Sequence, residues 1–237
     1  MKEVNLEEIK SKLIEKLRPS GWATKLSSFI NSSDFDKILK ELYTEMLNNR
    51  RFTPPLKQVF TAFEKCEYNK LKVVIIGQDP YFNLGVADGM AFSCSSTMKA
   101  QPSLEQIFKA LDKTVYQEWP TYQNPDLSRW AEQGVLLLNS SLTTEIGKAG
   151  THYSIWNDFI MYVIDMINLT NSGIIFILLG KKAQELESVI GPNHYILKAS
   201  HPASAAYSDG DWDCNDVFNE ANKIITANNG KELIINW

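Results

Sequence analysis

The chain is poor in cysteine and has no long apolar run. Its three cysteines, Cys66, Cys94 and Cys214, lie far apart and form no CxxC pair. This spacing argues against a disulfide framework or a cysteine-held metal cluster, and it favours a reducing cytoplasm. The longest unbroken apolar run, 174–179, is too short to cross a bilayer, so we expect no transmembrane helix and no membrane partner. Residues 1–13 lack the apolar block of a secretory signal peptide.

An excess of positive charge is also absent, because the 237 residues carry a formal net charge of -4. Such a chain has no overall attraction to nucleic acid, so nucleic-acid binding would need a local surface. The hydrophobic fraction of 44% and the charged fraction of 22% exclude a disordered chain, a collagen and a coiled coil. No internal repeat or Gly/Ser linker divides the sequence, so we predict one domain over residues 1–237.

Four short apolar runs predict β-strands, at residues 72–76, 135–138, 174–179 and 195–197. They are continuous rather than alternating, as in strands that are buried on both faces. Helical patterns separate them, which predicts an α/β fold with a central four-stranded parallel twisted sheet flanked by helices on both faces. The helical patterns cover residues 6–17, 33–46 and 59–63, a segment that opens at Ser103, and residues 127–133, 154–169, 181–190 and 215–225.

Two local predictions accompany these helices. Residues 1–50 are expected to form a helical N-terminal extension that packs on the rest of the domain. Ser103, with Gln106 three residues later, matches the pattern of a capping box, in which a serine hydroxyl caps the first turn.

Polar and aromatic residues follow the predicted strands. The first strand ends in a segment with Asp79 and Tyr81, the second in Asn139, the third in Gly180 and the fourth just before His201. In a parallel sheet, ligands bind beyond the carboxyl ends of the strands. We therefore expect a carboxylate, an amide, a histidine and an aromatic ring to meet at one edge of the sheet.

The order and spacing of GQDPY, LLLN and a late HP resemble those of family 1 uracil-DNA glycosylases. The resemblance runs from Pro54 to Phe218, and the first 50 residues carry little of it. It implies an enzyme that hydrolyses the bond between uracil and deoxyribose in DNA, which leaves an abasic site and begins base-excision repair. The matching strings are PPLKQVFTAF, KVVIIGQDPY, GMAFS, QPSL, NPDLSRWAEQGVLLLN, GKKAQ and KASHP.

The resemblance implies catalytic roles for Asp79 and His201. Asp79 would stabilise the positive charge that develops on the sugar and orient the attacking water. His201, as a neutral imidazole, would donate a hydrogen bond to uracil O2 as negative charge grows there. Preorganised donors of this kind are worth ~3–4 kcal/mol in barrier height.

The resemblance also implies which residues hold the base and the DNA. Phe92 would stack on uracil, Asn139 would pair with N3–H and O4, and Tyr81 would exclude the methyl group of thymine. The backbone N–H of Gln78 would help to hold the water or the uracil edge. DNA-binding positions are expected at Pro80, Ser103, Gly180, Lys181, Ser204 and Ala205, although Lys181 also suits a solvated helix start.

No metal or cofactor is needed for this chemistry. The resemblance implies a monomer that acts on uracil-containing DNA, with a protein inhibitor of such enzymes as a further partner. We expect a cytoplasmic protein, either in a bacterium or, for a viral protein, in the host cell.

Three features depart from the family pattern. Phe82 stands where the family motif GQDPYH has histidine, and Ala205 stands where the family has a leucine that wedges into the base stack. An acidic run follows in place of a basic residue. These changes predict a reduced rate and a preference for single-stranded DNA, because a lost wedge weakens base extrusion. The other positions involved are Ala203, in place of a serine, the acidic residues Asp209, Asp211 and Asp213, and Tyr207 as a substitute wedge.

Other interpretations remain open at the level of sequence. The changes at Phe82 and Ala205 also suit a catalytically weak DNA-binding or scaffold protein of the same fold. The altered loop 82–88 leaves room for a shifted base preference, such as hypoxanthine. A nucleotide-cofactor enzyme is set aside, because GxGxxG and GxxxxGK[ST] are absent. His194 is expected to be structural, and His152 suits a structural and a functional role equally.

Overall fold

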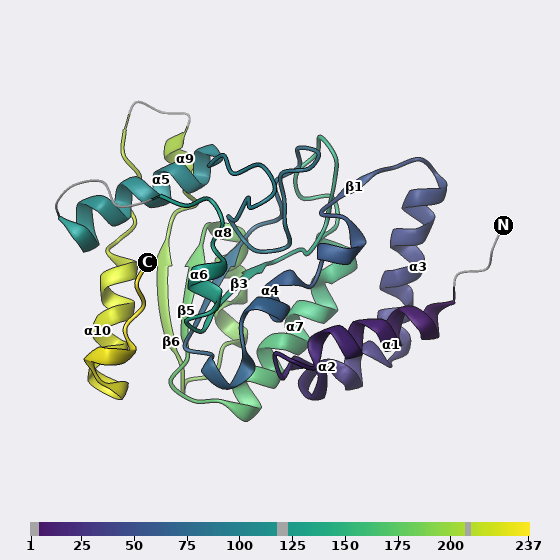
Figure 1. Ribbon diagram of the computed structural model, residues 1–237, viewed down its shortest axis with the longest axis horizontal. Helices are drawn as coiled ribbons and strands as arrows, with labels where there is room; N and C mark the ends of the chain where they lie inside the picture. Colours follow the sequence, from purple (N-terminus) through teal and green to yellow (C-terminus); the bar gives the residue numbers. More distant parts are fainter. Residues whose placement is uncertain (1–4, 118–122, 207–209) are drawn as a thin grey trace.

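The centre of the computed structural model is a four-stranded parallel sheet with the strand order β3-β2-β5-β6 (Figure 1). The strands are β2 (Val73–Gly77), β3 (Val135–Asn139), β5 (Ile175–Leu179) and β6 (Tyr195–Ala199). Helix α10 (Val217–Asn229) lies on one side of the sheet and α7 (Tyr153–Thr170) on the other. The predicted α/β class and parallel sheet are therefore confirmed. The structure describes residues 5–117, 123–206 and 210–237.

Three strands are buried along their whole length, and the fourth is not. Every residue of β2, β3 and β5 is buried, as their continuous apolar runs predict. Strand β6 lies at the edge of the sheet, and Tyr195 and Lys198 on it are exposed. The prediction that this run is buried on both faces is wrong. Helix α10 packs against β6 but leaves it partly exposed, whereas β3, at the other edge of the sheet, is covered by α4 (Thr61–Lys65) and α6 (Ser128–Ala131).

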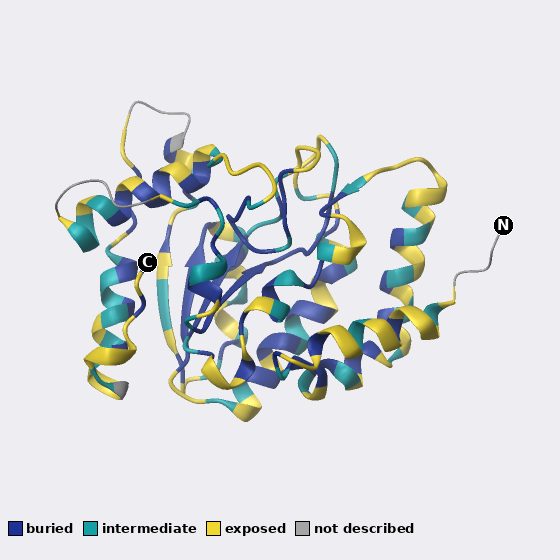
Figure 2. Cartoon of the chain, viewed as in Figure 1, coloured by how far each residue is buried: buried dark blue, intermediate teal, exposed yellow. Residues whose placement is uncertain are grey.

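The N-terminal extension contains three helices, α1 (Leu6–Leu17), α2 (Trp22–Ile30) and α3 (Ser33–Leu47). Helices α2 and α3 pack against α7, and buried side chains of the extension belong to the same apolar cluster as those of the sheet. Trp22 is fully buried, and its indole N–H donates to the carbonyl of Cys66 at 2.7 Å. Figure 2 shows the buried residues concentrated in the sheet and on the helix faces that meet it.

Several local predictions need correction. Ser103 does not cap its helix: α5 (Pro102–Leu111) begins one residue earlier, with Pro102 at its first position and Gln101 before it making no side-chain cap. The capping-box prediction is wrong because proline fills the first helical position, where no N–H is needed. The predicted helix 181–190 is divided into α8 (Lys181–Gln184) and a 3₁₀ helix, η4 (Glu185–Val189).

The remaining elements are short. Strands β1 and β4 form a two-stranded antiparallel sheet, which the sequence does not signal because each strand has two residues. No helix within the described ranges has the length and apolar character to cross a membrane. The remaining bounds are β1 (Phe52–Thr53), η1 (Leu56–Gln58), η2 (Tyr68–Lys70), η3 (Asp112–Tyr116, a π-helical turn), β4 (Thr144–Glu145), α9 (Ala203–Ala206) and η5 (Lys231–Leu233).

We propose that the extension and the sheet unfold as one unit, and Trp22→Ala tests this. The Trp22 ring packs edge-on against Phe63 and Tyr68, with ring centroids 5.0 Å apart in both pairs. Removal of a buried tryptophan costs ~3–5 kcal/mol of unfolding free energy. We expect urea unfolding, followed by far-ultraviolet circular dichroism, to show one transition at a lower midpoint.

Leu169→Ala is the matched control for this prediction. Leu169 is 84% exposed, so the variant should change the unfolding free energy by no more than ~0.5 kcal/mol. A Trp22→Ala protein with two transitions, of which the main one keeps the original midpoint, would show that the extension is a separate unit.

Candidate functional site

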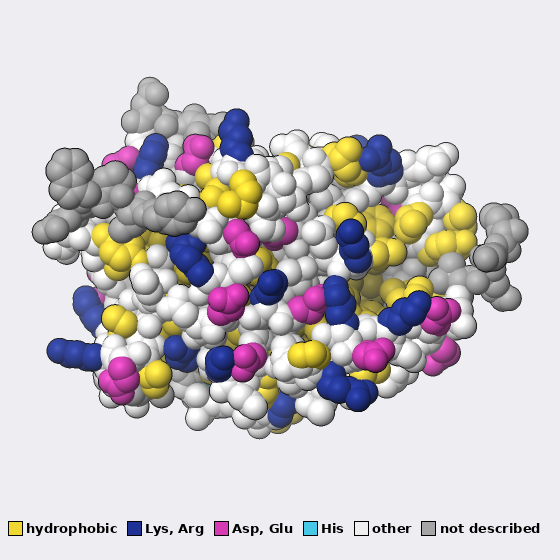
Figure 3. Space-filling model, in the orientation of Figure 1, with side chains coloured by type: hydrophobic (Ala, Val, Ile, Leu, Met, Phe, Trp, Pro, Cys, Tyr) yellow, Lys and Arg dark blue, Asp and Glu magenta, His cyan; other side chains and the backbone are white. Residues whose placement is uncertain are grey.

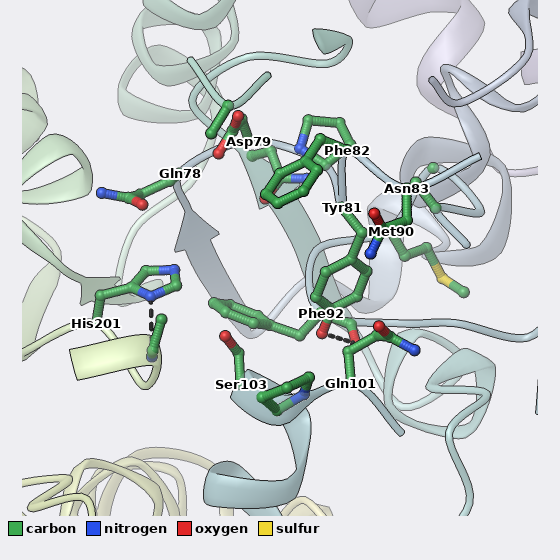
Figure 4. Close-up of a pocket in the computed structure, with 17 residues that line it drawn as sticks. Gln78, Asp79, Tyr81, Phe82, Asn83, Met90, Phe92, Gln101, Ser103 and His201 are labelled. Atoms are coloured by element: carbon green, nitrogen blue, oxygen red, sulfur yellow. Dashed lines mark hydrogen bonds between the residues drawn. The ribbon is translucent and has the colours of Figure 1, made fainter. Parts of the chain in front are cut away.

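A pocket of about 390 Å³ opens at the carboxyl edge of the sheet, where the sequence predicts a site (Figure 4). Most of the predicted site residues line it, although they come from distant parts of the chain. Four others, Gly180, Lys181, Ser204 and Ala205, lie outside the lining. The predicted residues that line the pocket are Gln78, Asp79, Pro80, Tyr81, Phe92, Ser103, Asn139 and His201.

Asp79 follows β2 and is held by a backbone donor. Its Oδ2 atom accepts a hydrogen bond of 2.6 Å from the N–H of Gly150. Burial raises the pKa of the Asp79 carboxyl above its ordinary value, while the Gly150 N–H and the Thr144 side chain act in the opposite direction. The carboxylate is therefore partly desolvated and fixed in orientation. Sequence reasoning did not identify Gly150, because a backbone donor 71 positions away leaves no sequence pattern.

His201 follows β6 on the opposite side of the pocket from Asp79 and Phe82 (Figure 4). Its Nδ1 atom accepts a hydrogen bond of 3.1 Å from the N–H of Ala203. Burial lowers the pKa of His201 to about 4, so the ring is neutral near pH 7. With Nδ1 as an acceptor, the single proton of the neutral ring lies on Nε2. The site thus presents a neutral N–H donor, the state that the family resemblance implies.

Gly180 lies next to His201 but does not line the pocket. It directly follows β5 and has a φ of 95°, a conformation that favours glycine. A Cβ atom at this position would lie 2.8 Å from the Cβ of His201. The lack of a side chain at Gly180 therefore allows the histidine to pack close to the strand end.

Asn139 is the last residue of β3 and pairs in register with Gly77 of β2. It is 7% exposed, and its side chain makes no hydrogen bond to the residues that the structure describes. A Cβ atom on Gly77 would lie 2.7 Å from Oδ1 of Asn139 and 3.2 Å from the ring of Phe92. Gly77 therefore makes the room in which the amide and the ring face the pocket. The carbonyl and NH₂ of Asn139 are available to a bound molecule.

Phe92 has a φ of 64°, which is unusual for an aromatic residue. Its backbone belongs to a turn that Asp88 organises from a buried position. The Asp88 carboxylate accepts hydrogen bonds from the N–H of Met90, the hydroxyl of Ser93 and the N–H of Ser95. Such strain persists only where the surroundings enforce it. Sequence reasoning missed Asp88, because an isolated aspartate in a loop gives no sign that it is buried.

Tyr81 forms one wall of the pocket. Its hydroxyl donates to the carbonyl of Phe92 at 3.0 Å, so the Tyr81 side chain is bonded to the backbone that carries the Phe92 ring. Burial raises the pKa of the Tyr81 phenol well above its ordinary value, so the group stays neutral. Phe82 lines the mouth of the pocket and remains 42% exposed, so it does not fill the cavity.

Two of the six predicted DNA-binding residues, Lys181 and Ser204, are exposed, whereas Pro80, Ser103, Gly180 and Ala205 are buried. Lys181 is exposed at the start of α8. Ser204 is exposed on α9, and its hydroxyl donates to the carbonyl of His201 at 2.7 Å. Ala205 is only 8% exposed, on a helix that packs against α5, so it does not project as a wedge. Tyr207 and Asp209 lie outside the described residues.

The other two histidines lie away from the pocket lining. His152 is buried, and its Nδ1 pairs with the hydroxyl of Thr143 at 2.8 Å. His194 precedes β6, at the other end of the sheet, where its Nδ1 accepts from the N–H of Ile174 at 3.2 Å. Both contacts are structural. The described residues contain no group of three or more His, Cys, Asp or Glu side chains suited to a metal ion.

Comparisons with known proteins give a consistent result. The family model of the Uracil DNA glycosylase superfamily matches residues 63–226. The chain is 38% identical over 219 residues to a uracil-DNA glycosylase of Buchnera aphidicola subsp. Acyrthosiphon pisum (strain APS), which covers 92% of this chain and 97% of that protein. It is 40% identical over 193 residues to a uracil-DNA glycosylase of Borreliella burgdorferi (strain ZS7), which covers 80% and 86% of the two chains.

Solved structures agree with the sequence relatives. A crystal structure of mimivirus uracil-DNA glycosylase matches with a TM-score of 0.81 and 25% identity, and it covers 94% of this chain and 88% of that one. A variant of the mimivirus enzyme in complex with UGI matches with a TM-score of 0.81 and 26% identity, and it covers 94% and 90%.

The protonation state of His201 is directly testable. Because burial lowers its pKa to about 4, we expect the ring to stay neutral from pH 8 down to about pH 5 and to gain a proton only below that range. Nitrogen-15 NMR of the histidine ring should show protonated Nε2 and unprotonated Nδ1. A pKa near 6.5 would contradict the burial of the His201 ring. A proton on Nδ1 would contradict the hydrogen bond from the N–H of Ala203.

Proposed function

The chain belongs to the uracil DNA glycosylase superfamily as a family 1 enzyme, and we propose that the pocket at the carboxyl edge of its sheet is the catalytic site. The protein hydrolyses the N-glycosidic bond of deoxyuridine in DNA, which releases uracil and leaves an abasic site. One observation carries the proposal: Asp79, Asn139 and His201 face one cavity from three strand ends. The roles of individual residues below are our proposals.

Recognition of uracil rests on Phe92 and Asn139. The base leaves the DNA stack and enters the pocket, because the scissile bond is out of reach inside a helix. The Phe92 ring stacks on it, the Asn139 carbonyl accepts from N3–H, and the Asn139 NH₂ donates to O4. Cytosine presents the opposite pattern at these two positions, and each unpaired buried group costs ~1–3 kcal/mol.

Exclusion of thymine rests on Tyr81. The phenol donates to the backbone of Phe92, so its ring does not move independently of the stacking ring. We place the Tyr81 ring against C5 of uracil, where thymine carries a methyl group. Since protein interiors are close-packed, an additional methyl group is not accommodated without displacement of this wall.

Bond cleavage uses Asp79 and His201 at opposite sides of the base. Positive charge develops on the sugar and is stabilised by the Asp79 carboxylate, which also orients the attacking water. Gly150 holds this carboxylate through its N–H. Negative charge develops on uracil and is stabilised at O2 by the Nε2–H of His201. A neutral donor suits this task, since a cation would oppose the positive charge on the sugar. The backbone N–H of Gln78 assists at the water or the uracil edge.

The DNA strand is proposed to follow a path with little basic charge. Acidic and basic side chains are interspersed on the face shown in Figure 3, without one large basic region. Ser103 lies at the N-terminus of the 10-residue helix α5 and lines the pocket, so this helix end can receive a phosphate. Pro80, Ser204 and the Gly180–Lys181 turn are proposed as further contacts to the strand.

We propose that the enzyme prefers single-stranded DNA. Ala205 stands at the wedge position, and its burial leaves no projecting side chain there. Asp213 is exposed on the segment that follows and repels the phosphates, whereas the exposed Asp211 is paired with Lys113 at 3.7 Å. Extrusion of a base costs a few kcal/mol from a duplex and least from a single strand. Loss of a wedge therefore weakens action on duplex DNA more than on single strands.

The proposed partners follow from the relatives. Since the mimivirus neighbour is solved in complex with UGI, we propose that an inhibitor protein of this kind also binds this chain. We further propose that the enzyme acts as a monomer in the cytoplasm. Its three cysteines are free and buried, as in proteins of a reducing compartment.

Asp79→Asn and His201→Ala should each lower the single-turnover rate of uracil release by about 100- to 1,000-fold, which corresponds to the loss of ~3–4 kcal/mol of transition-state stabilisation. Activity of the wild type should rise with pH through the raised pKa of Asp79, because the carboxylate must be ionised. His201, with a pKa of about 4, is neutral from about pH 5 upward and should therefore cause no loss of activity at alkaline pH.

The control for these variants is Asp158→Asn, an exposed carboxylate on α7 that should not affect the rate. Unchanged single-turnover rates in the Asp79 and His201 variants would rule out the assigned roles. A rate that falls as the pH rises from 5 to 8 would exclude a neutral His201.

Matched oligonucleotides test the strand preference. We expect kcat/KM on single-stranded DNA to exceed that on a U·A duplex by about 10-fold or more, and a U·G mismatch to lie between them because it opens more easily. Steady-state release of free uracil measures all three at one ionic strength. Equal turnover of the single strand and the U·A duplex would refute the preference.

A further inference from the structure

One large apolar side chain lies exposed at the pocket, and a second lies exposed two residues further along the same loop. Phe82 is 42% exposed and Leu84 is 63% exposed, on the loop that follows β2. Phe82 also lines the pocket, so the exposed surface is continuous with the catalytic site. In Figure 4 the Phe82 ring lies next to Asp79, across the pocket from His201. Phe92 and Tyr81, by contrast, are buried or half-buried.

The backbone around Phe82 and Leu84 is anchored on both sides. The carbonyl of Phe82 accepts from the N–H of Gly147 at 3.0 Å, and the N–H of Val86 donates to the carbonyl of Asn83 at 3.3 Å. Val86 is itself buried. The exposed ring is therefore positioned by the fold, and a ligand that contacts it does not first have to order the loop.

Gly89 fixes the far end of the same loop. It has a φ of 93°, and a Cβ atom there would lie 1.8 Å from the carbonyl oxygen of Gln58. The chain therefore passes directly against the segment that precedes α4. This close contact holds the residues between Phe82 and Gly89 at the mouth of the pocket.

We propose that Phe82 and Leu84 form a stacking shelf that binds the base next to the uracil in single-stranded DNA. This inference rests on the proposed function and extends it to a second nucleotide. Aromatic rings bind the faces of nucleic-acid bases without regard to sequence. A neighbouring base in a duplex is paired and stacked and is not available, whereas in a single strand it is free to reach the shelf.

The chemistry of the surroundings favours a base as the occupant. The chain has a net charge of -4, so attraction to phosphates contributes little and apolar contact must contribute more of the affinity. Two side chains are too small an area for a stable protein interface, which needs about 800 Å² on each partner. The shelf lies beside the pocket that receives the uracil, within reach of the same strand.

A scan with abasic nucleotides tests the shelf. Single-stranded oligonucleotides carry one deoxyuridine, and tetrahydrofuran replaces the nucleoside at each flanking position in turn. We expect one replacement to lower the kcat/KM of the wild type by about 5- to 150-fold, mainly through KM, which corresponds to stacking of ~1–3 kcal/mol. The kcat/KM of Phe82→Ala should not change on that replacement. The kcat/KM of Leu84→Ala should fall on that replacement, but by a smaller factor than that of the wild type.

Two further variants are matched to Phe82→Ala. Phe82→Tyr keeps an aromatic ring and should retain the dependence on the flanking base. Leu169→Ala removes an exposed apolar side chain at the far end of α7 and should respond to every replacement as the wild type does. If Phe82→Tyr keeps the dependence on the flanking base and Phe82→Ala loses it, the effect is due to stacking and not to a general change in the loop.

Three results would overturn the shelf. The first is a wild-type rate that no flanking replacement changes. The second is a Phe82→Ala protein that loses the same factor on every oligonucleotide, which would place the ring on the deoxyuridine itself. The third is a Phe82→Tyr protein that behaves like Phe82→Ala.

Failure of the proposed function is separable from failure of the shelf. It would appear as no release of uracil by the wild type from any oligonucleotide. The shelf is then tested by binding alone, with 2-aminopurine next to the deoxyuridine. Stacking on Phe82 should quench its fluorescence when the wild type binds, and Phe82→Ala should remove this quenching. Equal quenching by both proteins would contradict the shelf.

Discussion

The proposed active site depends on the parallel register of β2 with its two neighbours. This register sets Gly77 against Asn139 and brings the carboxyl ends of β2 and β3 to one edge of the sheet. Strand β5 lies between β2 and β6, so the segment after β6 brings His201 to the same edge. Because β2, β3 and β5 are buried along their whole length and polar residues follow them, a shift of register would place polar residues in the core. The positions of the catalytic groups are thus a consequence of core packing.

Burial raises the pKa of Asp79 and lowers the pKa of His201, the two proposed catalytic groups. Hydrogen bonds from the backbone then determine the form in which each group acts. Desolvation disfavours the charged form of both, which suits His201 as a neutral donor and opposes Asp79 as a carboxylate. The N–H of Ala203 leaves the His201 proton on Nε2, and the N–H of Gly150 stabilises the ionised Asp79. Both donors lie outside the sheet, Ala203 at the start of α9 and Gly150 in the turn before α7, so the segments around the sheet control the protonation states and the sheet controls the spacing. The proposed catalytic residues Asp79 and His201 are both present at the pocket, and the relatives are enzymes, which favours an active enzyme over the alternative of a non-enzymatic scaffold.

The sequence predicts the sheet well because its buried strands are continuous apolar runs, and it predicts the main site residues because they follow those runs directly. Features that depend on tertiary contact are missed. Helix α2 has no clear end signals, and its anchor Trp22 bonds to a carbonyl 44 positions away. The contribution of Asp88 depends on its burial, which composition does not reveal. The single-strand preference inferred from Ala205 stays a prediction, and the structure adds only that this side chain is buried.

The most direct test of the account is the base preference of Asn139→Asp. The Asn139 amide, at the end of β3, is proposed to discriminate between uracil and cytosine. The variant replaces the NH₂ that donates to uracil O4 with an oxygen that accepts from the amino group of cytosine. We predict that the ratio of uracil to cytosine release falls by at least about 10-fold and that cytosine release becomes measurable, whereas Asn83→Asp, at the pocket mouth, keeps the original preference. An unchanged ratio in Asn139→Asp would contradict the claim that this pocket reads the base.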